Sequence, residues 1–198
     1  MKYIVPIIVL FGLVCCNPNP KTSKPKTVSS NSEKSFKSEY SSLCSKYLDY
    51  PEIDTLITAY CNGAFQPSDD DKTVEFLRIL TQENDNLFPF YYRIFNYVLK
   101  SSDGALSEML PEYCLLFINN HPVEVIEDFK KNPNDLENYA QMLGYEFYFV
   151  NQGTSNSSMN YGQFKELLIS KIDLTNRQTN NTYNQFINKI DEAIKNME

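Results

Sequence analysis

The sequence has no tryptophan, one histidine and only six glycines in 198 residues. The single histidine, His121, excludes an HExxH zinc motif and any Cys/His cluster with zinc-binding spacing. The glycines are scattered singly, so no glycine-rich phosphate loop is present. GxSxG and SxxK nucleophile motifs are also missing. The sequence therefore predicts a protein without a metal site or cofactor, and the lack of tryptophan weakens a role in glycan capture.

Basic residues are also in short supply. Lysine and arginine total 18 against 25 aspartates and glutamates, which gives a formal net charge of −7. Such a chain repels phosphate backbones, so we expect no nucleic-acid partner. Hydrophobic residues make up 42% of the chain and aromatic residues 14%, which is enough apolar surface for a packed core.

No apolar run is long enough to span a bilayer. The longest, residues 4–14, has about eleven residues, whereas a membrane helix needs about twenty. It follows Met1-Lys2-Tyr3, a short positive segment. A short basic start followed by an apolar run of this length is typical of a secretory signal peptide.

The apolar run ends in Leu13-Val14-Cys15-Cys16. This stretch resembles the lipobox of bacterial lipoproteins, which has leucine three residues before an obligatory cysteine and a small residue directly before it. Cys16 fits as the modified residue, with Cys15 in the small-residue position. Modification of Cys15 is the alternative, and it is less favoured because it places the bulkier Val14 in that position. An ordinary signal peptide that ends in two cysteines is the other alternative.

The resemblance implies removal of residues 1–15, a diacylglycerol thioether on Cys16 and anchoring in a membrane of the bacterial cell envelope. Two or three acyl chains hold a protein far more firmly than one. No acidic residue directly follows Cys16, which favours the outer membrane if the cell has two membranes. Residues 16–35 contain Pro18, Pro20 and Pro25 among serine, threonine and lysine, and we expect them to form an extended tether.

From residue 36 onward, apolar side chains recur with the period of an α-helix. We expect a single all-α domain over residues 36–198, with eight or nine short helices. Pro51 is expected to open one helix, Asn134 to cap another, and Pro111 to kink or split a third. The helices form either stacked helical hairpins with a repeat of about 30–35 residues or an irregular globular bundle.

The remaining cysteines allow two interpretations. Cys44 and Cys61 fall on adjacent expected helices, and export would place them in an oxidising compartment, so a disulfide between them is plausible. Alternatively, Cys44, Cys61 and Cys114 are three small buried hydrophobic residues.

Several other polar and aromatic side chains are expected to have structural roles. The acidic run 69–71 lacks the spacing of a calcium loop and suits a helix N-terminus. Glu124, Glu127 and Asp128 are expected on a solvated helix face, and His121 is expected to be a cap or surface residue. Tyr92 and Tyr97 lie off the main apolar stripe of their helix, which makes them surface candidates.

The sequence thus predicts a lipid-anchored, non-enzymatic helical protein that faces the periplasm or the cell surface and binds another protein or assists an assembly. One alternative is an immunity-type lipoprotein that neutralises a toxin, because an acidic face can mask a basic site. The other alternative is an enzyme or binder directed at cell wall or glycan.

Overall fold

The computed structural model describes residues 40–82, 84, 86–154 and 159–198. All regular secondary structure in these residues is α-helical, which confirms the predicted all-α class. Residues 40–47 are helical at the start of this part of the chain. The elements that follow are α2 (Thr55–Cys61), α3 (Asp71–Leu80), α4 (Phe88–Ser101), α5 (Gly104–Asn120), α6 (Pro122–Phe129), α7 (Pro133–Asn151), α8 (Tyr161–Lys171) and α9 (Arg177–Lys195).

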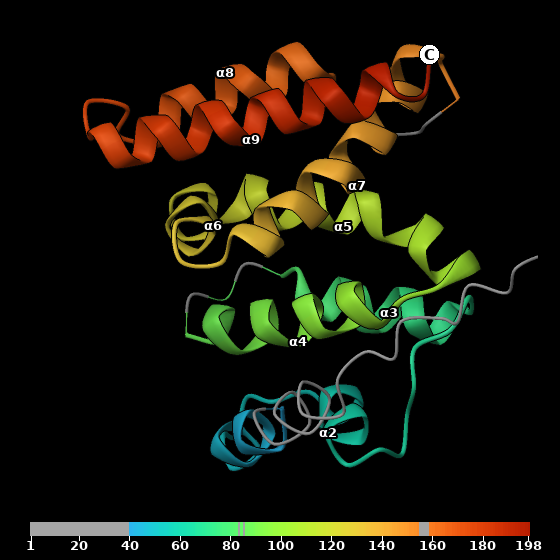
Figure 1. Cartoon of the computed structure of the whole chain (residues 1–198). Helices are drawn as coiled ribbons and strands as arrows, with labels where there is room; N and C mark the ends of the chain where they lie inside the picture. Colours follow the sequence, from blue (N-terminus) through green and yellow to red (C-terminus); the bar gives the residue numbers. More distant parts are fainter. Residues whose placement is uncertain (1–39, 83, 85, 155–158) are drawn as a thin grey trace, which may run out of the picture.

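The helices lie in layers that follow the order of the chain (Figure 1). The helix at 40–47 and α2 form the lowest layer, and α3 and α4 lie above them. A middle layer holds α5, α6 and α7, and α8 and α9 form the top layer. The arrangement combines the two predicted architectures, because the outer layers are helix pairs whereas the middle layer holds three helices.

Two helices begin at other residues than the sequence suggested. The second helix begins at Thr55 and not at Pro51, because the Asp54 side chain caps it by accepting a hydrogen bond from the Leu56 amide at 2.6 Å. The cap of α7 is Asn132 and not Asn134, because Pro133 occupies the first helical position, where its fixed φ angle is favourable.

Pro111 does not split α5, which continues from Gly104 to Asn120. Proline has no N–H, so residue 111 cannot donate the usual helical bond to the carbonyl of Ser107 one turn earlier. The proline ring is buried, and its packing favours the continuous helix.

A chain of aromatic rings connects the layers through the core. Phe95 of α4 lies 4.7 Å from Phe117 of α5, measured between ring centroids. Phe129 of α6 lies 5.4 Å from Tyr139 of α7 and 5.0 Å from Phe186 of α9. All five rings are buried, so α4 to α9 share one continuous hydrophobic core.

Cys44 and Cys61 form a disulfide that joins the helix at 40–47 to the last residue of α2, with their Cα atoms 5.6 Å apart. Their separation in sequence is 17 residues. Closing a loop of this size lowers the entropy of the unfolded chain and stabilises the fold by about 3 kcal/mol. Cys114 is a fully buried free thiol. The predicted lipid-attachment residue Cys16, its alternative Cys15 and the tether at 16–35 lie outside the described residues.

Candidate functional site

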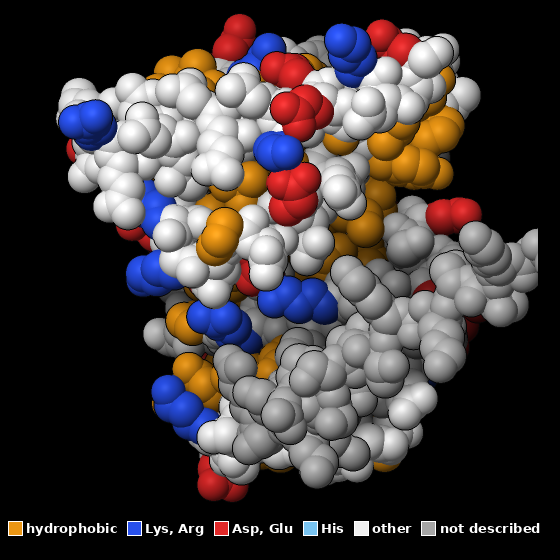
Figure 2. All heavy atoms as spheres, in the orientation of Figure 1, with side chains coloured by type: hydrophobic (Ala, Val, Ile, Leu, Met, Phe, Trp, Pro, Cys, Tyr) orange, Lys and Arg blue, Asp and Glu red, His pale blue; other side chains and the backbone are white. Residues whose placement is uncertain are grey.

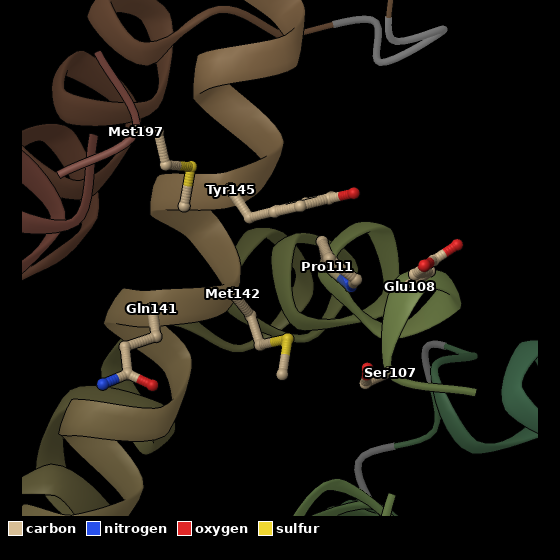
Figure 3. A pocket seen from close by; sticks show the side chains of 7 residues that line it. All are labelled: Ser107, Glu108, Pro111, Gln141, Met142, Tyr145 and Met197. Atoms are coloured by element: carbon tan, nitrogen blue, oxygen red, sulfur yellow. The ribbon is translucent and has the colours of Figure 1, made fainter. Parts of the chain in front are cut away.

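An apolar groove of about 160 Å³ opens between α5, α7 and the residues that follow α9 (Figure 3). Typical small-molecule sites have volumes of about 300–1,000 Å³, so this groove has room for a single side chain of a partner. Its walls are almost wholly apolar. The lining residues are Ser107, Glu108, Pro111, Gln141, Met142, Tyr145 and Met197.

The side chains that line the groove come from three separate segments. Tyr145 extends from α7 toward the side where Pro111 and Glu108 of α5 lie (Figure 3). Met142 and Met197 both present thioethers to the groove (Figure 3). Methionine side chains are flexible and polarisable, so two of them give the groove walls that can adapt to different apolar groups.

A close crossing of α7 and α9 brings Met197 to the groove. A Cβ atom added to Gly144 would lie 2.4 Å from the Cβ of Ala193, so the two helices approach as closely as they do only because residue 144 is glycine. Met197 follows Ala193 by four residues, about one helical turn. Tyr145 directly follows Gly144, so the crossing places the groove's tyrosine and Met197 near each other.

Three aromatic side chains lie next to one another along α7, of which Tyr145 is exposed and lines the groove, whereas Tyr148 and Phe149 are half-buried. The Tyr145 side chain is 37% exposed, and its ring lies 4.6 Å from that of Phe149 one turn later. The Tyr148 ring packs edge-on against Phe149 at 5.3 Å. Figure 2 shows hydrophobic side chains gathered on the right of this face, where the surface is hollowed between the layers. We call Tyr145, Tyr148 and Phe149 the aromatic strip of α7.

Ser107, Glu108 and Gln141 are the polar residues that line the groove. Glu108 is the one charged residue among the side chains that line it. Glu112, one turn later on α5, and Glu198, next to Met197, are both exposed and acidic, whereas Lys195 in the last turn of α9 is basic. The Ser107 carbonyl lacks the N–H that an ordinary residue at position 111 would supply. The groove is therefore an apolar site with a net negative rim.

A second cavity, of about 300 Å³, lies where α2, α4 and the start of α5 meet. Tyr60, Ser101 and Asp103 contribute polar atoms to it, and Val98 and Leu106 contribute apolar ones. The Tyr60 ring packs against Tyr40 at 5.7 Å, and burial raises the pKa of Tyr60 to about 12. Tyr60 is therefore neutral at physiological pH. Its ring packs against the core of this region, and the residue lines the cavity.

Asp128 of α6 belongs to a cluster of polar side chains and does not lie on the solvated helix face that the sequence suggested. Its carboxylate accepts a hydrogen bond from the Tyr92 hydroxyl at 3.3 Å and one from the Asn132 amide at 2.8 Å. The Arg93 guanidinium lies 3.6 Å away. Asp128 therefore joins the C-terminal end of α6 to α4, whereas Glu124 and Glu127 are exposed as expected.

An ion pair in which only the carboxylate is buried joins α4 to α7. Lys100 Nζ lies 2.7 Å from Asp135 Oδ1, and the Asp135 side chain is only 2% exposed. The Asn96 amide donates to the other carboxylate oxygen of Asp135 at 3.3 Å. Nearby, burial raises the pKa of the fully buried Tyr139 well above its ordinary value. Asp135 thus binds both Lys100 and Asn96 of α4, and these contacts orient α4 against α7. The buried Asn96 Oδ1 and Tyr139 hydroxyl have no hydrogen-bond partner among the described residues.

Tyr92 and Tyr97 are not surface residues, since they are 3% and 9% exposed. Helix α4 contacts α3, α5 and α7, so it is covered on more sides than one apolar stripe can indicate. The tyrosines that do reach the surface near a cavity are Tyr145 on α7 and Tyr60 on α2.

The other residues singled out from the sequence have structural roles. His121 is the residue between α5 and α6, as its expected capping role requires, but it is 6% exposed and its ring lies 4.2 Å from Phe88. Asp70 caps α3 by accepting a hydrogen bond from the Thr73 amide at 2.8 Å, and this bond lowers the pKa of Asp70. Cys114 lies in the core, where burial raises the pKa of its thiol.

Within the described parts of the chain, no group of three or more His, Cys, Asp or Glu side chains is arranged to hold a metal ion. The helices of those same parts include none with the length and apolar character needed to cross a membrane. Comparisons with known protein families, with curated proteins and with solved structures find no match to the chain.

Proposed function

We propose that the chain is a lipid-anchored, non-enzymatic helical protein of the bacterial cell envelope that binds another protein through the groove between α5 and α7. The observation that carries the binding role is Tyr145, a large and exposed side chain beside an almost wholly apolar groove. Tyrosine is enriched at protein interfaces because it combines a rigid apolar ring with a polar hydroxyl.

Two features support the envelope location. Leu13 and Cys16 match the lipobox positions, and the apolar run before them has signal-peptide length. The disulfide between Cys44 and Cys61 is the second feature, because such bonds persist in oxidising compartments outside the cytosol.

The anchor is tested by Cys16→Ser in cells that make the protein and are fed a labelled fatty acid. We expect the full chain to incorporate label and to stay with the membranes, whereas Cys16→Ser carries no label and remains uncleaved or becomes mislocalised. Cys15→Ser is the matched control and should keep its label, because serine also suits the small-residue position. Label that survives Cys16→Ser and disappears in Cys15→Ser would move the anchor to Cys15.

The binding role is tested by a photo-crosslinking amino acid placed at Tyr145 of the full chain. We expect ultraviolet light to give one discrete, higher-mass product from the site at 145. Ile169 of α8 is the control site, because it is 52% exposed and lies outside the groove residues. Equal products from both sites, or none from 145, would contradict binding through this groove.

An immunity-type role is a second candidate that the acidic rim favours. Glu108 in the groove wall and a formal net charge of −7 would complement a basic toxin surface. This role uses the same groove and the same anchor, and differs in the identity of the partner. Protection of cells by the wild-type chain, lost on Tyr145→Ser, would distinguish it from an assembly role.

A further inference from the structure

We infer that the partner presents a basic amphipathic helix to the groove, with one apolar side chain inserted between Pro111, Met142 and Tyr145 and a flanking lysine or arginine beside Glu108. This inference rests on the proposed function and names the chemistry of the partner. The arguments are the size of the groove, the geometry of the aromatic strip and the charge of the rim.

The size of the groove limits the inserted group. A volume of about 160 Å³ is too small for a folded element or a typical ligand, and it suits one aliphatic or aromatic side chain. The walls are nearly free of polar atoms, so inserting a polar side chain would leave its hydrogen-bonding groups without partners. The group that enters is therefore apolar.

The aromatic strip of α7 provides a second contact one turn away. Tyr145 and Phe149 are four residues apart, which places them about 6 Å apart along the helix axis. Apolar side chains three or four residues apart on a partner helix have the same spacing. A helix that inserts one side chain beside Tyr145 can thus lay a second one on Phe149, and this helix-in-groove mode needs an amphipathic sequence.

The rim determines the charge of the partner. Glu108 lines the groove; Glu112 lies one helical turn after it on α5, Glu198 directly follows Met197 in the sequence, and Lys195 is a cation two residues before Met197. A cationic donor beside the inserted side chain complements these carboxylates, whereas an acidic one would be repelled.

Three labelled helical peptides of equal length are the probes. The first places leucines on one face and lysines on the other, the second replaces the lysines with glutamates, and the third shuffles the first so that no apolar face remains. Binding to the full chain in phosphatidylcholine nanodiscs is measured by fluorescence anisotropy, with empty nanodiscs subtracted. We expect the basic amphipathic peptide to bind at least tenfold more tightly than either of the others.

Variants of the full chain connect this preference to the groove. Tyr145→Ser is expected to weaken binding of the basic peptide by about tenfold, a loss typical of an interface anchor. Glu108→Gln is expected to weaken binding by about threefold and to reduce the dependence on salt. Ile169→Ser removes an even more exposed apolar side chain, from α8, and should leave the affinity unchanged.

Two results would overturn the inference: equal or tighter binding of the acidic peptide, or the same loss of binding in Ile169→Ser as in Tyr145→Ser. Neither result would contradict the proposed function, which is protein binding through the groove, because the crosslink at residue 145 does not depend on the charge of the partner. Conversely, a missing crosslink in cells together with tight binding of the basic peptide would leave the chemistry of the groove intact and remove the proposed cellular role.

Discussion

Gly144→Ala is expected to lower the free energy of unfolding by about 3 kcal/mol, at the upper end of the cost of overpacking a core. The new Cβ would lie 2.4 Å from the Cβ of Ala193, so α7 and α9 would have to move apart. Elsewhere in a helix the same change is favourable by up to about 1 kcal/mol, because glycine is the poorer helix former. A loss of stability in Gly144→Ala would therefore indicate a close crossing of α7 and α9, whereas a gain would indicate that the helices are farther apart. Denaturant-induced unfolding followed by circular dichroism measures it.

A double-mutant cycle isolates this contact. Ala193→Gly removes the opposing Cβ and should cost about 1 kcal/mol through its lower helix propensity. In the double variant, the Cβ at residue 144 meets only backbone atoms of residue 193 at 3.4 Å, an ordinary contact distance. The double variant should therefore be more stable than Gly144→Ala alone. If the two costs simply add, the crossing is not as close as described.

Lys100→Met is expected to lower the free energy of unfolding by about 2 kcal/mol. Breaking a fully buried ion pair costs about 3–5 kcal/mol, because the remaining charge has no counterion. Lys100 is 36% exposed, so solvent screens part of the interaction and the loss is smaller. Asp135, which is 2% exposed, would keep only the amide of Asn96 as a partner. Urea unfolding at neutral pH checks the expected loss.

Replacing both members of the pair should recover most of that loss. Lys100→Met combined with Asp135→Leu removes the buried charge together with its counterion, and such replacements are often neutral or stabilising. The control is Lys189→Met, which breaks contacts with the half-exposed Glu137 and the exposed Glu192 and should leave the free energy of unfolding unchanged. A double variant less stable than Lys100→Met would show that Asp135 contributes more than charge pairing.

The periodicity of apolar residues was sufficient to predict the fold class and the rough position of each described helix. It was less accurate at helix starts, because these depend on single side chains. Asp54 and Asn132 begin helices where Pro51 and Asn134 seemed suitable, and only the geometry of the cap separates the candidates. Periodicity also failed at Tyr92 and Tyr97, since one helical stripe cannot show that α4 is covered by several neighbours, and at Asp128 of α6, whose partners lie on α4.

The groove could not be predicted, because its walls come from three segments that are far apart in the sequence. Two local signals were nevertheless present. Pro111 inside an apolar helical pattern marks a carbonyl without its usual donor, and Gly144 inside another marks a close approach of two backbones. Each signal marks a local departure from regular helix structure. Neither signal identifies the residues of the other helices that pack at that position.

The disulfide also determines how mechanical force would enter the body. Force applied at residue 40 enters the described part of the fold through the helix at 40–47, which contains Cys44. The covalent path then passes from Cys44 directly to Cys61, so residues 45–60 carry no tension. If the domain is held at a membrane by its N-terminal end, a force between the membrane and a bound partner would pass through the disulfide to α3 and the layers above it. Helix α2 would be bypassed by this force.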